Sequence, residues 1–338
     1  MRVFIKTLKF VAILLVILVS AFFLGPKAEK IKLNQLTPKM PSNLLALETK
    51  INNSEAAISK IKPDNEARII WYDSIPQKTA YSIVYLHGWS ASQEEGDPIH
   101  TATAKRYGCN LYLPRLAGHG LKEEEPMLNL TAESLMQSAL EALSIGKQLG
   151  ENVILMGTST GGTLALQLAA SDPDVAALLV YSPNIEIFDP NAKLMTGPWG
   201  LQLLKAIKGS DYHEFDTDID LKNKYWTTKY RVEALVQLQA LLDATMTKET
   251  FKNVTQPLFM GYYYKDEIHQ DSVVSVPAML KMFDELSTPV SQKQKVAFPD
   301  AGDHVMTSYI SSKDLESVQE KTNNFLEEVV GIKKALTK

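Results

Sequence analysis

A serine framed by glycines is the first feature of this sequence that could do chemistry. The pentapeptide Gly157-Thr-Ser159-Thr-Gly161 follows an apolar run, 152–156, and precedes a second apolar segment, 164–170. A strand followed by a helix would place the pentapeptide on a tight turn that exposes the serine hydroxyl. The N–H groups of such a helix would face negative charge that develops there. We interpret Ser159 as a nucleophile, and the alternative is a glycine-rich turn without catalysis.

A nucleophilic serine needs a base, and the base needs a carboxylate that orients it. The chain holds six histidines: His87, His100, His119, His213, His269 and His304. In a strand–turn–helix setting the chain order is serine, acid, base, which favours a histidine late in the sequence. We predict His304 as the base, because it follows the last predicted strand, 294–298. We predict Asp266 as the acid after the predicted strand 257–261, and Glu267 and Asp271 remain alternatives.

Two backbone N–H groups are candidates for holding a developing oxyanion. One belongs to Thr160, the residue after the nucleophile, and the other to Trp89, which follows the predicted strand 81–86. His87 lies in the same loop. Because His87 precedes every candidate acid, we interpret it as a structural histidine that binds loop backbone.

Strands alternate with helices through most of the chain. Strand-like runs lie at 68–72, 81–86, 109–113, 152–156, 175–181, 257–261 and 294–298, and helical spacing occurs at 132–149, 164–170 and 315–330. This alternation predicts an α/β fold, a mostly parallel sheet with helices on both faces. Residues 184–256 interrupt the rhythm with a long helical segment and many aromatic residues. We expect this stretch to form a helical cap inserted between two strands.

The composition excludes several classes of protein. The 338 residues carry a net charge of −4 without any run of five like charges, so the electrostatic footprint of a nucleic-acid-binding protein is missing. Cys109 is the only cysteine, which excludes an intrachain disulfide framework and a cysteine-rich zinc site.

The N-terminal region has the pattern of a segment directed to a membrane. Residues 10–25 contain one polar side chain, Ser20, and Arg2, Lys6 and Lys9 precede them. No small-x-small cleavage pattern is present near Pro26, so we favour an uncleaved signal anchor. The short segment before the apolar run favours an extracytoplasmic catalytic domain. The alternative is a cleaved signal and a secreted or periplasmic protein. We therefore divide the chain into an anchor at 1–26, a tether with a short helix at 27–65, and a catalytic domain at 66–338.

Several motifs together resemble the α/β-hydrolase superfamily, in particular its bacterial carboxylesterase and monoacylglycerol-lipase-like branch. They are Tyr85-Leu-His-Gly-Trp-Ser-Ala-Ser92, Leu113-Pro-Arg-Leu-Ala-Gly-His-Gly120, Gly157–Gly162, Tyr181-Ser-Pro-Asn184, Lys265-Asp266 and Ala301-Gly-Asp-His304. The resemblance implies an eight-stranded sheet with one antiparallel strand, a helical lid after the strand ending near Tyr181, and neither cofactor nor metal. Trp89 departs from the smaller residue or Phe of many relatives, and we expect it to narrow the acyl pocket.

These features predict a serine hydrolase that acts on carboxylic esters with short to medium acyl chains, small or lipid-like molecules. Ser159, Asp266 and His304 would form the triad, and the N–H groups of Trp89 and Thr160 would form the oxyanion hole. An acyltransferase or amidase with the same triad is an alternative interpretation, because acceptor choice depends on the cap. A non-catalytic anchored binding module is the hypothesis from another class.

Overall fold

The computed structural model describes residues 2–33, 37–215 and 217–335. The main sheet contains β1 (Arg68–Ile70), β2 (Thr79–Leu86), β3 (Asn110–Leu113), β4 (Gly150–Thr158), β5 (Val175–Tyr181), β8 (Leu258–Tyr262) and β9 (Lys293–Ala297). The helices outside the insertion are α1 (Arg2–Phe23), α2 (Leu44–Ala56), α3 (Ile99–Tyr107), α4 (Ala132–Leu149), α5 (Thr160–Ser171), α10 (Val276–Glu285) and α11 (Leu315–Phe325). Shorter turns are η1 (Gln93–Gly96), η3 (Val290–Gln292) and a π-helical turn, η4 (Leu326–Val330).

The sheet has seven strands among the described residues, in the order β1-β3-β2-β4-β5-β8-β9. All neighbours pair in parallel except β1 and β3. The α/β fold with one antiparallel strand is therefore confirmed, and the expectation of eight strands is wrong. The region before β1 forms helix α2 and a loop through Pro63 instead of an edge strand. Proline cannot donate a ladder hydrogen bond, which disfavours a strand there.

Side chains on alternate strand positions enter two separate cores. Val84 and Leu86 of β2 contribute to one core, with α4, α5 and α10, whereas Ile83 and Tyr85 contribute to the other, with α3 and α11. This alternation follows from the two-residue repeat of a strand. Both faces are covered, so the central strands carry continuous buried apolar runs, such as 153–156 in β4 and 177–180 in β5.

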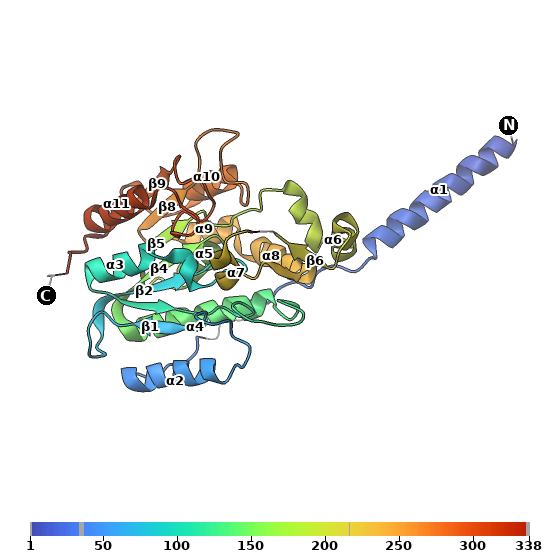
Figure 1. Cartoon of the computed structure of the whole chain (residues 1–338). Helices are drawn as coiled ribbons and strands as arrows, with labels where there is room; N and C mark the ends of the chain where they lie inside the picture. Colours follow the sequence, from blue (N-terminus) through green and yellow to red (C-terminus); the bar gives the residue numbers. More distant parts are fainter. Residues whose placement is uncertain (1, 34–36, 216, 336–338) are drawn as a thin grey trace.

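The insertion between β5 and β8 holds most of the remaining elements. These are η2 (Pro190–Thr196), α6 (Gly200–Lys208), β6 (Tyr212–Glu214), α7 (Asp220–Tyr225), β7 (Lys229–Arg231), α8 (Val232–Thr245) and α9 (Lys248–Asn253). Strands β6 and β7 pair as a small antiparallel ribbon outside the main sheet. In Figure 1, α8, β6 and α6 lie toward the end of the molecule from which α1 emerges.

Helix α1 projects away from the rest of the described chain (Figure 1). Its residues Phe4–Phe23 form a helix apolar enough to cross a bilayer by length and composition, and none of that window is buried. Twenty residues of α-helix span about 30 Å, which matches the hydrocarbon thickness of a membrane. The backbone N–H of Trp199 donates to Pro26 O (2.7 Å), and its indole Nε1–H donates to Ala21 O (3.3 Å). The end of α1 is thus attached to the insertion.

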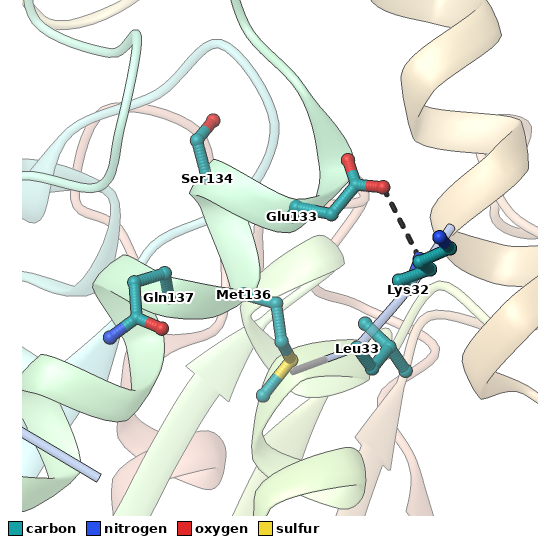
Figure 2. A pocket seen from close by; sticks show the side chains of 6 residues that line it. All are labelled: Lys32, Leu33, Glu133, Ser134, Met136 and Gln137. Atoms are coloured by element: carbon teal, nitrogen blue, oxygen red, sulfur yellow. Dashed lines mark hydrogen bonds between the residues drawn. The ribbon is translucent and has the colours of Figure 1, made fainter. Parts of the chain in front are cut away.

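The chain after α1 packs along α4. Figure 2 shows Lys32 and Leu33 facing the first turns of α4, where the Lys32 backbone N–H donates to Glu133 Oε1 (3.3 Å). Leu33 packs against the core that α4 covers. The small hollow between this segment and α4 shares no lining residue with the cavity at Ser159.

Candidate active site

The carboxyl ends of five parallel strands converge on one edge of the sheet. The loop His87–Trp89 follows β2, Ser159 follows β4 and Asn184 lies just beyond β5. Asp271 lies in the loop after β8, and His304 in the loop after β9. Ligands of open parallel sheets bind at this edge, because loops from neighbouring strands meet there.

Ser159 lies on a strained turn between β4 and α5. Its backbone has φ 55° and ψ −120°, a conformation that non-glycine residues rarely adopt. The turn is held by the Ser159 N–H, which donates to Tyr181 O (2.9 Å). A Cβ at Gly161 would overlap the carbonyl oxygen of Leu86, and one at Gly157 would lie 2.5 Å from the carbonyl oxygen of Gly161. The two glycines are therefore required by close backbone approach.

His304 is paired with Asp271. Its Nδ1–H donates to Asp271 Oδ2 (2.6 Å), and the Asp271 side chain is fully buried. The other carboxylate oxygen, Oδ1, accepts the backbone N–H groups of Val273 (2.9 Å) and Val274 (3.0 Å). These bonds fix the carboxylate, which in turn holds the imidazole with Nδ1 protonated and Nε2 free to accept a proton.

The pair shifts both pKa values. Burial acts to lower the pKa of His304, but the carboxylates of Asp271, Asp303 and Glu95 outweigh it, so the pKa lies above its usual value. Burial acts to raise the pKa of Asp271, but the His304 charge and the hydrogen bonds from His304, Val274 and Val273 keep it below its usual value. Both shifts favour the ion pair, so the site is arranged to stabilise a protonated His304.

Asp266, predicted as the partner of His304, is instead paired with His269, so that expectation is corrected. Asp266 Oδ1 accepts from His269 Nδ1 (2.9 Å), and both side chains are more than half exposed. The chain doubles back after β8: Lys265 N–H donates to His269 O, and Asp271 N–H donates to Tyr263 O. The excursion carries Asp266 out to solvent and returns Asp271 to the end of the strand.

The sequence contains a feature that favours Asp271 as the acid. It is missed when the acid is chosen only by its closeness to the end of the preceding strand. Asp271 is followed by Val273 and Val274, and then by Ser275, whose hydroxyl caps α10. Asp271 and Val274 are buried and Val273 is half exposed, while residues 264–270 are polar or exposed. An acid at the start of the returning apolar segment is better placed to face the sheet than one at the tip of the loop.

The loop after β2 is held by side chains on both sides. Leu116 N–H donates to His87 Nε2 (3.1 Å), so the proton lies on Nδ1, which donates to Gly88 O (3.0 Å). His87 thus binds loop backbone, which confirms its structural role. The carbonyl of Gly88 belongs to the same peptide as the Trp89 N–H, so His87 also fixes the direction of that N–H. In the described part of the chain, neither the Trp89 N–H nor the Thr160 N–H donates to a protein acceptor.

Ser159 and His304 line one cavity of about 600 Å³. Strand-end loops and the insertion both contribute to its wall. Its apolar side is formed by Trp89, Phe215, Trp226, Tyr230, Leu235 and Leu238. The ring of Trp89 packs edge-on against His119 and Tyr230, so the indole forms a rigid part of the wall.

Among the aromatic residues of the insertion, Phe215, Trp226 and Tyr230 line this cavity. Three others make different contacts. Tyr225 O–H donates to Asp64 Oδ2 (2.5 Å), Tyr212 O–H donates to Glu125 Oε1 (2.7 Å), and Trp199 contacts the end of α1. Among the described residues, no three His, Cys, Asp or Glu side chains gather into a group that could hold a metal ion.

The seven-stranded sheet, the strained serine turn and the strand-end histidine define an α/β protein with a hydrolase-like site. Residues 83–309 match the model of the alpha/beta hydrolase family, so the chain belongs to this family.

The chain is similar to a lipase in sequence and to lipolytic enzymes and esterases in fold. It is 30% identical over 166 residues to a thermostable monoacylglycerol lipase of Bacillus sp. (strain H-257), which covers 49% of this chain and 63% of that protein. The match thus spans less than two thirds of the relative's length. A structure from a study of the metagenome-derived lipolytic enzymes LipS and LipT superposes with a TM-score of 0.64 at 16% identity, over 80% of this chain and all of that one. Est1E from Butyrivibrio proteoclasticus, solved with ferulic acid, superposes with a TM-score of 0.54 at 17% identity, over 81% and all of the two chains.

Proposed function

We propose that the protein is a serine hydrolase that cleaves carboxylic esters through an acyl-enzyme on Ser159. The observation that carries this proposal is one cavity lined both by a serine on a strained strand-to-helix turn and by the histidine of a buried His304–Asp271 pair. Membership of the alpha/beta hydrolase family and the similarity to a monoacylglycerol lipase support the same class of reaction.

In the proposed reaction, His304 Nε2 removes the proton of Ser159 Oγ as the oxygen attacks the ester carbonyl. Asp271 keeps a proton on Nδ1 and stabilises the imidazolium that forms. The N–H groups of Trp89 and Thr160 donate to the tetrahedral oxyanion. His304 then protonates the leaving alcohol, and the same base later activates the water that releases the acid.

The cavity wall supports esters with apolar acyl chains of short to medium length. The rings of Phe215, Trp226 and Tyr230 offer apolar surface, and each buried CH₂ of an acyl chain adds about 0.8 kcal/mol. Trp89 restricts the width beside the reacting carbonyl, so bulky branched acids fit poorly.

We further propose that α1 anchors the enzyme in a membrane, with the catalytic domain on the extracytoplasmic side. The uninterrupted apolar surface of Phe4–Phe23 and its complete exposure support an anchor. The contact between Trp199 and the end of α1 would keep the insertion close to the membrane surface, where amphiphilic esters collect.

Labelling with a fluorophosphonate probe tests the proposal, because such probes react with activated serines. The wild-type protein should be labelled and Ser159→Ala should not. Ser272→Ala is the matched control, since Ser272 lines the same cavity and should leave labelling unchanged. Ser159→Ala should also reduce kcat for ester hydrolysis by about 10⁶-fold with the fold preserved. A variant that keeps more than about a tenth of the wild-type activity would refute the assignment.

A further inference from the structure

Glu95 is a buried carboxyl group beside Ser159 that the scheme above does not use. It belongs to η1, its residue is 2% exposed, and it lines the same cavity as Ser159 and His304. Its position is shown by Gly88: a Cβ added there would lie 2.6 Å from Glu95 Oε1 and 3.1 Å from Ser159 Cβ. The carboxyl group and the serine therefore flank the same point of the loop after β2.

The carboxyl group has hydrogen-bond donors but no ion-pair partner. Its Oε2 accepts the Gly88 N–H (2.5 Å) and the Tyr85 hydroxyl (3.1 Å). No Lys or Arg of the described residues forms an ion pair with it. Burial raises the pKa of Glu95 to about 7, although the Gly88 N–H and the charge of His304 act to lower it. The short bond from the Gly88 N–H is typical of a carboxylate acceptor.

A closed set of hydrogen bonds connects Glu95 to the residue before Ser159 and to the loop that carries His304. The Tyr85 hydroxyl lies 3.1 Å from Thr158 Oγ1, which lies 3.2 Å from Thr307 Oγ1, and Thr307 donates to the backbone oxygen of Glu95 (2.9 Å). Thr158 directly precedes Ser159, and Thr307 follows His304 by three residues. All four side chains are buried, so these bonds are shielded from water.

We propose that Glu95 is a positioning residue of the hydrolytic site: its carboxylate holds Gly88 so that the Trp89 N–H faces the oxyanion, and its charge stabilises protonated His304. This inference rests on the proposed ester hydrolysis. Glycine is the residue whose backbone rotates most freely, so the peptide between Gly88 and Trp89, whose N–H is the oxyanion donor, needs outside restraint. Glu95 holds the N–H of Gly88 and His87 holds its carbonyl, which together fix the peptide that carries the Trp89 N–H.

The charge effect involves a small set of neighbouring groups. His304 faces Asp271 from the loop after β8, Asp303 from its own loop and Glu95 from η1, and Lys222 of α7 lies 3.7 Å from Asp303. Glu95 faces Tyr85 of β2 as well as His304 and Asp303. His100 of α3 packs on Tyr85, and burial lowers its pKa to about 4, so it adds no positive charge near neutral pH. Removing the Glu95 charge should therefore weaken proton binding by His304.

Two substitutions separate the contact from the charge. Glu95→Gln keeps an oxygen that can accept the Gly88 N–H but has no charge, so kcat at alkaline pH should stay within about threefold of wild type. The acidic limb of its kcat/KM profile should move to lower pH by at least about 0.3 units. Glu95→Asp keeps the charge but is one methylene too short for Gly88. Its kcat should fall about tenfold with little change in KM, because the misdirected donor acts only in the transition state.

The assay is hydrolysis of 4-nitrophenyl butyrate by the full chain from about pH 5 to about pH 9. Glu94→Gln is the matched control: the Glu94 side chain accepts from the Tyr309 hydroxyl instead, and this variant should keep both the wild-type kcat and the wild-type limb. Thermal melting of each variant shows whether it is folded. Glu95→Gln has nearly the same side-chain shape as wild type, so we expect it to fold even if Glu95→Asp does not.

A Glu95→Gln limb that coincides with that of wild type would overturn the charge effect, and a folded Glu95→Asp with wild-type kcat would overturn the positioning effect. Both comparisons use a wild-type enzyme that is active and labelled at Ser159. Failure of this inference alone would leave that labelling intact, whereas failure of the proposed function would abolish it.

Discussion

Replacing Asp271 with Asn should reduce kcat about 10⁴-fold, whereas Asp266→Asn should have little effect. The two acids lie five positions apart in one loop, and the same chemical change is made at each. Only Asp271 contacts His304, and it is fully buried there. Asp266 accepts from His269 and from backbone N–H groups at the exposed tip of the loop.

The size of the loss in kcat follows from which ring nitrogen of His304 carries the proton. In the Asp271→Asn variant, the side-chain carbonyl oxygen would still accept the N–H groups of Val273 and Val274. The amide NH₂ would then face His304 Nδ1. Nδ1 must then accept a hydrogen bond, which moves the ring proton to Nε2, the atom that has to receive the serine proton. A loss of about 10⁴ corresponds to roughly 5.5 kcal/mol of transition-state stabilisation.

Measuring kcat and KM for 4-nitrophenyl butyrate hydrolysis checks this prediction. The loss should appear in kcat with KM nearly unchanged, because the ground-state ester does not contact Asp271. The acidic limb of Asp271→Asn should also shift to lower pH, since the carboxylate that raises the pKa of His304 is gone. Asp266→Asn should remain within about twofold of wild type, as substitutions at exposed positions usually do.

A larger loss for Asp266→Asn than for Asp271→Asn would refute the assignment of the acid. Equal, small losses would show that His304 needs no carboxylate partner for its role. Thermal melting of both variants distinguishes a slow enzyme from an unfolded one.

Four further outcomes are expected. The kcat/KM of wild type should rise with pH through an apparent pKa above about 6.5, because the base must be neutral and Asp271 raises the pKa of His304. An acidic limb well below that pH would contradict the His304–Asp271 pairing. In stability, the His304 contribution should be complete below about pH 6.5 and disappear as pH rises through its folded pKa, which pH-dependent urea unfolding measures. Deleting residues 1–26 should move an active enzyme from the membrane fraction to the soluble one. If the intact mass of the wild-type protein gives an N-terminus near Lys27, an uncleaved anchor is excluded. Across 4-nitrophenyl esters, kcat/KM should increase from acetate to medium chains, and Trp226→Ala should weaken that increase; a steady fall from acetate onward would show that the insertion lines no acyl site.

Local sequence patterns were sufficient for most of the sheet. The limits predicted for the strand at 175–181 and the helix at 132–149 coincide with β5 and α4. Long apolar runs bounded by Gly, Pro and polar residues are strong local signals, because the strands are buried on both faces and the helices on one. The edge of the sheet was harder, since the expected eighth strand depended on the resemblance and not on any apolar run before Arg68.

The sequence by itself placed Ser159 on a strand-to-helix turn, because the Gly-x-Ser-x-Gly motif lies between an apolar strand-like run, 152–156, and an apolar helical segment, 164–170. It also indicated His304, through its place after the last strand. The apolar residues after Asp271 favour that acid, but the tertiary structure decided which carboxylate meets His304, because the loop after β8 folds back on itself through backbone bonds that many polar sequences could make. The same holds for Glu95, whose burial beside Gly88 depends on contacts from three separate strands and loops. Pairings between distant loops depend on how the whole sheet brings the strand ends together, and the residues of one loop do not determine this arrangement.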